Sequence, residues 1–290
     1  MRPPLRGWDP IMGMNARNRL IAEVNSKDAI RLVNNKYETK QALTDAGAPT
    51  SPTVRLVKTR REIKDIDWAT MPDSWALKPN QGLGGSGIML AAGRQDAHWR
   101  KVSGKPLFQN EITSHLARII DGDFSPRLTD WALFEPLIHA HPALARMSFQ
   151  GLPDIRVICV GDEPRLAMLR LPTKHSGGRA NLHQRAIGAA VDLDTGRVVK
   201  ARVGSQPIES HPDSGYPLIG AVVPHWTAVL DAAGRCAAAT GLRYLGADIV
   251  VDRTRGPLIL EVNARPGLQI QNISGQGLIA SIELDESTSR

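Results

Sequence analysis

The chain contains few cysteines and few aromatic residues, and each scarcity excludes a class of protein. Its 290 residues include 2 cysteines, Cys159 and Cys236, which are too few and too far apart for a disulfide framework or a cysteine zinc site. We therefore expect two reduced, buried thiols. Aromatic residues make up 4% of the chain, which leaves few side chains on which nucleic-acid bases could stack.

Long apolar runs are missing as well. No stretch of about 18 uncharged apolar residues occurs, so we expect no membrane-spanning helix. The segment MRPPLRGWDPIMGMNARNRL at residues 1–20 lacks the continuous apolar core of a secretory signal. These absences favour an intracellular, cytoplasmic protein without membrane insertion.

Positive charge exceeds negative charge, with 36 Lys and Arg against 29 Asp and Glu and a net charge of +7. A basic surface suits nucleic acid, but it equally suits nucleotide phosphates and carboxylates. The densest basic run, VKTRREIK at 57–64, fits a solvated helix face better than a nucleic-acid patch. Charge alone does not choose between these partners, and together with the scarcity of aromatic residues this run makes nucleic acid the less expected one. A homo-oligomer is left open.

What is present is an alternation of helix and strand patterns. Helical patterns lie at 35–46, 109–120 and 222–240, and strand patterns lie at 53–57, 74–79, 88–92 and 131–138. Three further segments read as hairpins, 154–171, 186–203 and 245–263, with turns at 161–163, 194–196 and 255–256. The sequence thus predicts an α+β chain with a long antiparallel sheet, built around one large core or two to three subdomains.

A glycine-rich loop between two predicted strands carries the first chemical signal. KPNQGLGGSG has glycines at 82, 84, 85 and 87, so its backbone can adopt positive φ and bring N–H groups against an anion. Lys78 adds a positive charge at the end of the preceding strand. The segment lacks the Gly-Lys-Ser/Thr of a P-loop, and a strand follows it in place of the helix of a dinucleotide fingerprint. On its own it fits a phosphate loop and a plain hairpin tip equally well.

The third hairpin carries two carboxylates and an amide near its open end. Glu261 and Asn263 lie two residues apart, so they leave the same face of an extended chain. If GADIVVD pairs antiparallel with LILEVN through the turn at 255–256, Asp248 lies close to both. Oxygen ligands of this kind suit Mg²⁺, which also binds the phosphate oxygens of a substrate. The alternative is a structural polar pair, which needs buried partners that the sequence does not reveal.

Seven segments, in this order, resemble one known family. They are NNKYETKQAL, ALKPNQGLGGSGI, FEPLI, DIRVICVGDEPRLAMLR, GRANLHQ, GADIV and LEVNARPG, and the resemblance covers residues 30–280. The chain resembles the ATP-grasp superfamily, and within it the α-L-glutamate ligase-like group related to the ligase that adds glutamate to a ribosomal protein. The resemblance implies the ATP-grasp fold, in which two α+β subdomains with mainly antiparallel sheets clasp ATP. We expect a short N-terminal segment at 1–34, the entry and glycine-loop subdomains at 35–134, and a C-terminal subdomain with the hinge and metal site at 135–290.

The resemblance also implies roles for single residues. The adenine would bind the hinge backbone at Glu135, Pro136, Leu137 and Ile138, although Pro136 has no N–H to donate. The phosphates would contact Lys36, Lys78, Gly82, Gly84, Gly85 and Gly87, and further nucleotide contacts would come from Asp154, Arg179, Ala180 and Asn181. The magnesium ligands would be Asp248, Glu261 and Asn263, and the basic residues facing the transferring phosphoryl group would be Arg156 and Arg170. Two Mg²⁺ ions are expected, with Mn²⁺ as a substitute.

Arg265 departs from the pattern of the glutamate-adding ligases. It follows Asn263 by two residues, so on an extended chain it leaves the same face as the metal ligands. Because the planar guanidinium fork matches a carboxylate, we expect Arg265 to bind the acceptor carboxylate or its acyl phosphate. Candidates for deprotonating the amine are Lys174, His175 and His183, although a substrate-loop contact or solvent exposure explains each of them as well.

The activity that the resemblance implies is an ADP-forming ligation of a carboxylate to an amine. A carboxylate, for example that of glutamate, attacks the γ-phosphate of ATP to give an acyl phosphate, and an amine or peptide acceptor then displaces phosphate. No Gly-x-Ser-x-Gly elbow competes with this interpretation. Two alternatives are an ATP-grasp enzyme that forms an ester or thioester or phosphorylates its acceptor, and a non-catalytic nucleotide-binding regulator. The intact metal triad argues against the regulator.

Overall fold

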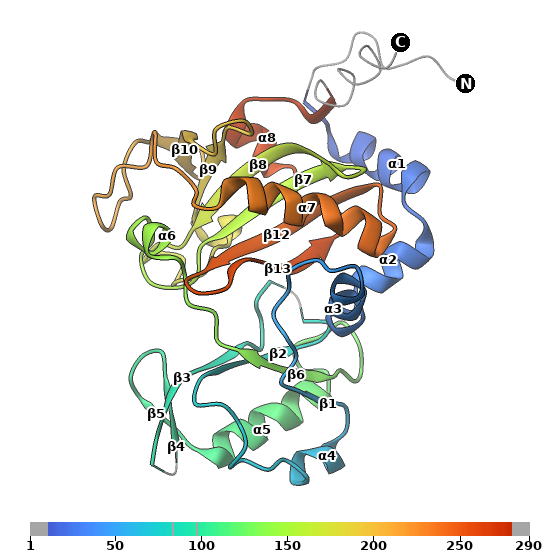
Figure 1. Cartoon of the computed structure of the whole chain (residues 1–290), viewed down its shortest axis with the longest axis vertical. Coiled ribbons are helices and arrows are strands. Elements are labelled where there is room, and N and C mark those ends of the chain that lie inside the picture. Colours follow the sequence, from blue (N-terminus) through green and yellow to red (C-terminus); the bar gives the residue numbers. More distant parts are fainter. Residues whose placement is uncertain (1–10, 83, 97, 280–290) are drawn as a thin grey trace. The chain divides into compact units, whose positions relative to one another are not determined.

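The computed structural model describes residues 11–82, 84–96 and 98–279. The chain forms two compact units (Figure 1). Unit 1 is made of Met1–Val33, Ala42–Pro49 and Ala140–Arg290, and unit 2 is made of Asn34–Gln41 and Thr50–His139. The outer ends of the predicted N-terminal and C-terminal segments, 1–10 and 280–290, lie outside the described residues.

Unit 1 contains a seven-stranded antiparallel sheet. Its strands are β7 (Asp154–Val160), β8 (Glu163–Leu171), β9 (Ile187–Val191), β10 (Val198–Val203), β11 (Gln206–Ile208), β12 (Tyr244–Asp252) and β13 (Gly256–Asn263). In space they follow the order β11-β10-β9-β8-β7-β12-β13, and every neighbouring pair is antiparallel. The three predicted hairpins are β7–β8, β9–β10 and β12–β13, so each hairpin prediction is confirmed.

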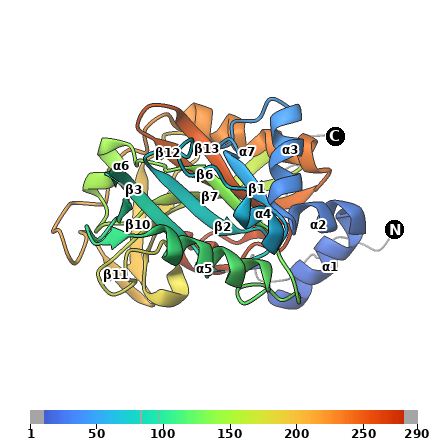
Figure 2. The ribbon, with the colours of Figure 1, turned by 90° about the horizontal axis from the view of Figure 1, so that it is seen from below.

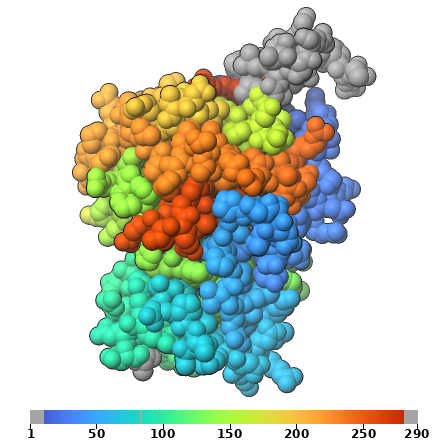
Figure 3. All heavy atoms as spheres, in the orientation of Figure 1, coloured from blue at the N-terminus to red at the C-terminus, as the bar shows by residue number. Residues whose placement is uncertain are grey.

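One face of this sheet is apolar and packs against helices. Alternate residues such as Val157, Leu169 and Ala247 point to it and join one core cluster with α7 (Trp226–Thr240) and α2 (Lys27–Val33). The outer side of α7 forms part of the surface of unit 1 in Figure 3. This face holds most of the apolar core of unit 1.

The opposite face of the sheet is apolar at one end only. There Ile158, Met168 and Tyr244 pack with α1 (Met14–Val24) and α8 (Gln269–Ser274). The same face continues along the strands to the polar residues that the sequence singled out. The core cluster therefore fixes the strands that carry the candidate site.

A side-chain turn closes the β12–β13 hairpin. Oδ1 of Asp252 accepts hydrogen bonds from the backbone N–H groups of Thr254 and Arg255, each at 3.0 Å. Gly256 follows with a φ of +73°, a left-handed conformation that glycine adopts without a steric penalty. This turn fixes the pairing register at the closed end of the hairpin.

Unit 2 is built on a six-stranded antiparallel sheet. Its strands are β1 (Arg55–Val57), β2 (Trp75–Pro79), β3 (Met89–Gln95), β4 (His98–Lys101), β5 (Pro106–Leu107) and β6 (Ala132–Pro136), in the spatial order β1-β6-β2-β3-β4-β5. Helix α5 (Gln109–Ile120) lies across one face of it in Figure 2. Trp75, Leu77 and Phe134 on that face form a core cluster with Ile112 of α5.

The longer helices agree with the sequence patterns, with one difference. The patterns at 35–46 and 109–120 are confirmed as α3 (Lys36–Asp45) and α5. The helix predicted from residue 222 begins only at Trp226. Val223 instead donates its N–H to the carbonyl of Gly196 at 2.9 Å, and His225 has a φ of +56°, which a continuing helix does not allow.

The sequence patterns missed the shorter elements. These are α1 and α2 in the predicted N-terminal segment, α6 (Pro142–Arg146), the 3-10 helix at Leu182–Gln184, α8, β4, β5 and β11. The helix expected within the basic run at 57–64 is present as α4 (Arg60–Lys64). The predicted domain boundary after residue 134 falls within β6, and unit 2 continues to His139. The functional division into three segments stays a proposal.

Two further expectations concern the cysteines and the membrane. Cys159 and Cys236 are free and buried, as predicted, and burial raises the pKa of Cys236 to about 12. Within the described ranges, no helix is long and apolar enough to cross a membrane.

Candidate active site

A β-bulge brings the predicted metal ligands together. Strands β12 and β13 keep one register from their turn to Ile249 and then shift by one residue, so that Asp248 lies opposite Glu261. In the register of the turn, Glu261 would lie opposite Ala247, whose side chain points into the α7 cluster. A shift of one residue moves a side chain to the other face of a strand. The bulge therefore places Glu261 and Asn263 on the same face as Asp248, close together as predicted.

Two arginines from neighbouring strands bind Asp248. Arg156 on β7 donates to its two oxygens through Nε and Nη2, at 2.7 and 2.6 Å. Nη2 of Arg170, on β8, lies 2.8 Å from Oδ2 of Asp248, and the same guanidinium group also binds both oxygens of Asp154. The amide nitrogen of Asn263 lies 3.4 Å from Oδ2 of Asp248. Five of the predicted site residues thus form one connected polar group in unit 1.

The two aspartates of this group differ in acidity. Burial disfavours the charged form of Asp248, but the positive charges of Arg156 and Arg170 outweigh it and hold its pKa at about 2. Burial raises the pKa of Asp154 to about 6, with Arg170 opposing the shift and the negative charge of Asp248 adding to it. At neutral pH Asp248 is therefore a carboxylate balanced by two guanidinium groups.

The donor atoms of this group suit a hard divalent cation. Asp248, Glu261 and Asn263 offer two carboxylates and an amide on adjacent strands, the oxygen donors that Mg²⁺ prefers. In the described part of the chain, no three His, Cys, Asp or Glu residues are grouped so that they could hold a metal ion. Mg²⁺ commonly binds through one or two carboxylates and completes its shell with water and substrate phosphate. The donor atoms present therefore fit Mg²⁺, and an ion bound there would share Asp248 with the two arginines.

In unit 2, one carboxylate binds two lysines. Glu135 on β6 accepts from Nζ of Lys78 on β2 at 2.8 Å and from Nζ of Lys40 on α3 at 2.5 Å. Burial lowers the pKa of Lys40 while the charge of Glu135 opposes that shift. Lys78 and Glu135 were predicted as site residues, for phosphate and for the hinge backbone, but neither their ion pair nor Lys40 was predicted. Its only signal was its position four residues after Lys36, which places both lysines on one face of a helix.

The first residues of the glycine loop are anchored to other parts of unit 2. Nζ of Lys36 donates to the carbonyl of Gly82 at 2.8 Å, and Oδ1 of Asn80 accepts from the first turn of α3 at 2.8 Å. The carboxylate of Asp130 accepts the N–H of Gln81 at 2.9 Å, and burial raises the pKa of Asp130. Lys36, predicted to contact phosphate, thus binds the base of the loop. The sequence analysis missed Asn80 and Asp130.

The second half of the loop has the predicted backbone conformation. Gly84, Gly85 and Gly87 have φ values of +60°, +77° and +75°, as the glycine pattern indicates. The carbonyl of Gly87 accepts a hydrogen bond from Nε2 of His115 at 2.8 Å, and a Cβ atom at Gly87 would lie 2.6 Å from the ring of Phe124. Helix α5 and the residues after it therefore set the position of the loop end.

The other predicted residues lie beyond strand ends. The segment Arg179, Ala180 and Asn181 follows β8, and Oδ1 of Asn181 accepts the N–H of His183 at 3.0 Å, which starts the 3-10 helix. Exposed side chains in this loop are Lys174, His175, Arg179 and His183.

Arg265 and the predicted hinge also follow strand ends. Arg265 is exposed, two residues after β13, and the carbonyl of the next residue, Pro266, accepts from Nη1 of Arg17 at 3.1 Å. The hinge at 135–138 begins on β6 and continues past its last residue. Of the predicted residues, the structure thus joins Asp154, Arg156, Arg170, Asp248 and Asn263 in unit 1 and Lys78 with Glu135 in unit 2.

Comparison with known families identifies the fold. A family model described as sugar-transfer associated ATP-grasp matches residues 15–285, which include nearly all of both units. The chain belongs to the sugar-transfer associated ATP-grasp family. No curated protein matches the sequence.

Solved ATP-grasp structures share this fold at low sequence identity. The ATP-grasp ligase PsnB, complexed with the precursor peptide PsnA2 and AMPPNP, is 16% identical with a TM-score of 0.50, over 92% of this chain and 63% of PsnB. D-alanine–D-alanine ligase from Bacillus anthracis, complexed with ATP, is 13% identical with a TM-score of 0.50, over 93% of this chain and 72% of the ligase. VanG D-Ala:D-Ser ligase from Enterococcus faecalis is 12% identical with a TM-score of 0.50, over 89% of this chain and 62% of VanG. The ATP-grasp chain thus spans less than two thirds of PsnB and of VanG.

These matches confirm the predicted ATP-grasp fold and its α+β class. The narrower expectation, membership of the α-L-glutamate ligase-like group, stays a prediction.

Proposed function

We propose that this ATP-grasp chain is an ATP-dependent carboxylate–amine ligase that forms ADP through an acyl phosphate. The observation that supports this most is the polar group on β12 and β13, where Asp248, Glu261 and Asn263 meet Arg156 and Arg170. Such a group combines ligands for a divalent cation with positive charge for a phosphoryl group. The same arginines would also satisfy a purely structural carboxylate, so the activity assay below distinguishes the two roles.

The proposed reaction has two steps. An oxygen of the substrate carboxylate attacks the γ-phosphorus of ATP, the bond to the β–γ bridging oxygen breaks, and ADP leaves. The amine nitrogen then attacks the carbonyl carbon of the acyl phosphate, phosphate leaves with the electron pair of the C–O bond, and the nitrogen loses a proton. Negative charge collects on phosphoryl oxygens in both steps, so positive charge in the site matters more than a protein nucleophile.

The metal ligands in this proposal are Asp248, Glu261 and Asn263. The family pattern suggests two Mg²⁺ ions, for which Mn²⁺ could substitute. Bound there, they would act as Lewis acids on the phosphate oxygens. The carboxylate charge of Asp248 and Glu261 would hold the ions, and Asn263 would contribute its amide oxygen.

The arginines in this proposal orient the reacting groups. Arg156 and Arg170 bind the aspartates through Nε and Nη2, so we assign the Nη1 side of each guanidinium to a phosphoryl oxygen. Arg265, exposed beyond β13, is assigned to the substrate carboxylate or its acyl phosphate. Asp248 thereby positions Arg156 and Arg170 as well as binding metal.

The nucleotide contacts in this proposal are the residues that the family resemblance assigns. In unit 2 they are Lys36, Lys78, the glycine loop and the hinge backbone at 135–138; in unit 1 they are Asp154 and the segment 179–181. The Pro136 peptide lacks a donor, so the adenine must be read by the N–H groups that follow it. Lys174, His175 and His183 stay the candidates for removing the amine proton.

For the substrates we propose an amino acid such as glutamate as the carboxylate and an amine or peptide as the acceptor. The PsnB structure contains a bound precursor peptide, and the D-alanine–D-alanine ligase is a ligase of amino acids. The family description, sugar-transfer associated, favours a second candidate, an amino sugar or sugar hydroxyl as the acceptor, which would give an amide or an ester.

A coupled ADP-release assay tests the proposal. The full chain is supplied with Mg²⁺-ATP and with pairs drawn from amino acids, acidic peptides and amino sugars, and product masses are read afterwards. We expect ADP release that needs both a carboxylate and an acceptor, and a product mass equal to the two substrates less one water. ADP release with a phosphorylated acceptor would instead support the kinase alternative.

A further inference from the structure

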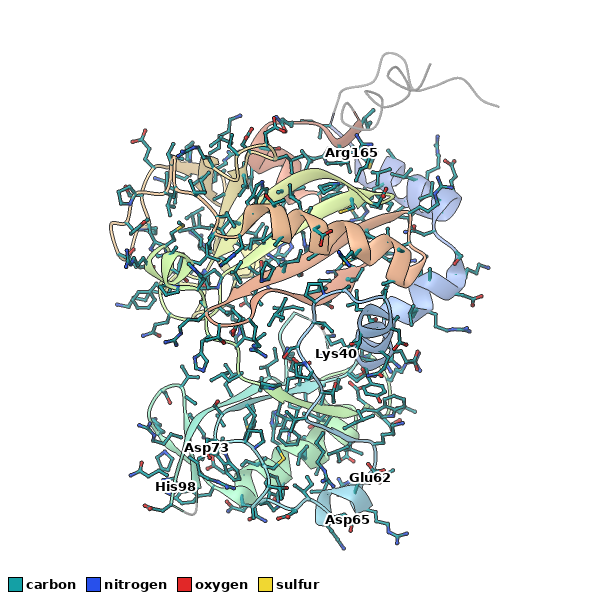
Figure 4. The ribbon with its side chains drawn as sticks, in the orientation of Figure 1. Lys40, Glu62, Asp65, Asp73, His98 and Arg165 are labelled. Carbon is teal, nitrogen blue, oxygen red and sulfur yellow. The ribbon has the colours of Figure 1, made fainter. Side chains whose placement is uncertain are left out.

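Lys40, Glu135 and Lys78 form a buried ion-pair cluster in unit 2. Their side chains are 8%, 6% and 17% exposed. Nζ of Lys40 lies 2.5 Å from Oε1 of Glu135, and Nζ of Lys78 lies 2.8 Å from Oε2. Each oxygen of the carboxylate therefore has its own ammonium group. Lys40 reaches the cluster from α3 (Figure 4).

The pairing of β2 with β6 explains why two of these residues meet. Lys78 lies opposite Leu133, and Glu135 lies opposite Ala76, so Lys78 and Glu135 are diagonal neighbours on one face of the sheet. The intervening Phe134 points to the other face, into the core cluster. The strands alone would give one ion pair with a formal charge of zero.

Helix α3 changes the charge of this pair. Lys40 adds a second ammonium group, so two positive charges and one negative charge sum to +1. Lys36, one turn earlier on the same helix, binds the carbonyl of Gly82 at the base of the glycine loop. The helix thus contacts both parts of unit 2 that were assigned to the nucleotide. A buried excess of positive charge is costly unless an anion accompanies it.

We propose that Lys40 is a positioning residue of the nucleotide site. Its ammonium group occupies Oε1 of Glu135, so that the ammonium group of Lys78 stays directed to a phosphate oxygen. The inference rests on the proposed function and deepens it, because it states that the cluster binds the polyphosphate of the nucleotide and does not contact its nucleoside. An ammonium group has three N–H donors, so one bond to Glu135 leaves two for a phosphate. Without Lys40, both oxygens of Glu135 would compete with the phosphate for Lys78.

The test compares ATP with adenosine on the full-length chain in the presence of Mg²⁺. Dissociation constants are measured by calorimetry for ATP and by ligand-observed NMR for adenosine, and the ratio of the two constants is the readout. In Lys40→Met we expect ATP binding to weaken about tenfold and adenosine binding to stay within about threefold, because only the phosphate contact loses a net charge. Lys40→Arg keeps the charge and should keep the ratio.

Two further variants control this result. Lys64→Met makes the same chemical change at an exposed lysine of α4 in unit 2 and should leave the ratio unchanged. The double variant Lys40→Met with Glu135→Gln restores a formal charge of +1 and should restore the ratio to within about threefold of the wild type. The double variant also decides the matter if Lys40→Met alone does not fold, because it removes both partners of the ion pair.

Other outcomes would overturn the proposal. An unchanged ratio in Lys40→Met, or an equal loss of ATP and adenosine binding, would give Lys40 a purely structural role. A double variant that still binds ATP about tenfold more weakly would exclude the charge argument. A wild-type chain that binds neither ligand would refute the proposed function and the inference with it. A wild-type chain that binds both ligands, together with an unchanged ratio in Lys40→Met, would refute the inference alone.

Discussion

At the scale of single residues, Glu261 on β13 is expected to contribute to turnover through the charge of its carboxylate. It is half-buried opposite Asp248, and its carboxylate is one of two in the proposed metal set. Glu261→Gln keeps the shape of the side chain and removes its charge. We expect turnover to fall at least about hundredfold, since a catalytic metal supplies several kcal/mol of charge stabilisation.

Thermal unfolding separates this effect from misfolding. Without ligand, the melting temperature of Glu261→Gln should change little, whereas the rise caused by Mg²⁺-ATP should shrink. Glu209→Gln, at an exposed glutamate of unit 1, is the matched control and should keep both turnover and the ligand-induced rise. Full activity in Glu261→Gln would return Glu261 to a structural role.

Arg265 tests the placement of the substrate carboxylate. Lysine keeps the charge but lacks the planar fork, so Arg265→Lys should raise the KM for the carboxylate about tenfold or more, while ATP affinity stays near normal. Arg253→Lys, at an exposed arginine in the turn of the same hairpin, should change neither. If Arg265→Lys loses ATP affinity and keeps its carboxylate KM, Arg265 belongs to the nucleotide contacts.

At the scale of elements, the glycine loop depends on its contact with the segment after α5. Gly87 has a φ of +75°, and a Cβ atom there would lie 2.6 Å from the Phe124 ring. Gly84 has a φ of +60°, but a Cβ atom there would have nothing within 4 Å. The two glycines therefore separate backbone strain from steric contact.

We expect Gly87→Ala to lower the free energy of unfolding of unit 2 by about 1–3 kcal/mol from backbone strain, with the clash adding to it. Gly84→Ala, the matched control, should lower it by about 1 kcal/mol from strain alone. Urea unfolding followed by tryptophan fluorescence measures this, because Trp68, Trp75, Trp99 and Trp131 all lie in unit 2. Equal losses in the two variants would mean that Phe124 moves away without cost.

His115 links α5 to the same loop and makes its stability depend on pH. Burial lowers the pKa of His115 below its usual 6.5, with the bond to Gly87 opposing that shift. As the pH falls below 6.5, the unfolded chain binds the proton first, so the free energy of unfolding decreases until the pH passes the lower pKa of the folded state. Stability from this residue is therefore present above pH 6.5 and lost on acidification.

Urea unfolding at several pH values between 5 and 7 checks this dependence. His115→Gln should remove part of the loss of stability on acidification, and His98→Gln, the matched control in unit 2, should retain it. An identical pH dependence in wild type and His115→Gln would show that the loop bond contributes nothing to it.

At the scale of the whole molecule, the family match covers residues 15–285, which include all the residues assigned to the proposed reaction. The acyl-phosphate route proposed for them places the attack at the γ-phosphorus of ATP. We therefore expect ADP and phosphate as products, at a one-to-one ratio with the ligated product. Chromatography of a turnover mixture measures this. AMP with pyrophosphate would point to adenylation of the carboxylate and exclude the proposed mechanism.

The sequence by itself determined the longer helices, the three hairpins of unit 1 and the type of fold. Local periodicity predicted the three hairpins of unit 1, and the glycine pattern predicted the positive φ values of Gly84, Gly85 and Gly87. These features depend on residues that are close in the chain, where side-chain period and backbone preference act directly. The order of motifs was enough for the ATP-grasp fold.

Only the tertiary structure decided how the site residues face one another. Periodicity put Glu261 and Asn263 on one face, but whether that face is shared with Asp248 depends on the one-residue bulge in β13, which no local pattern announces. In the same way, Lys40 looks like any helical lysine until packing sets it against Glu135. A register shift and an ion-pair partner are both contacts between residues far apart in the chain, so their geometry is set by packing and not by the local sequence.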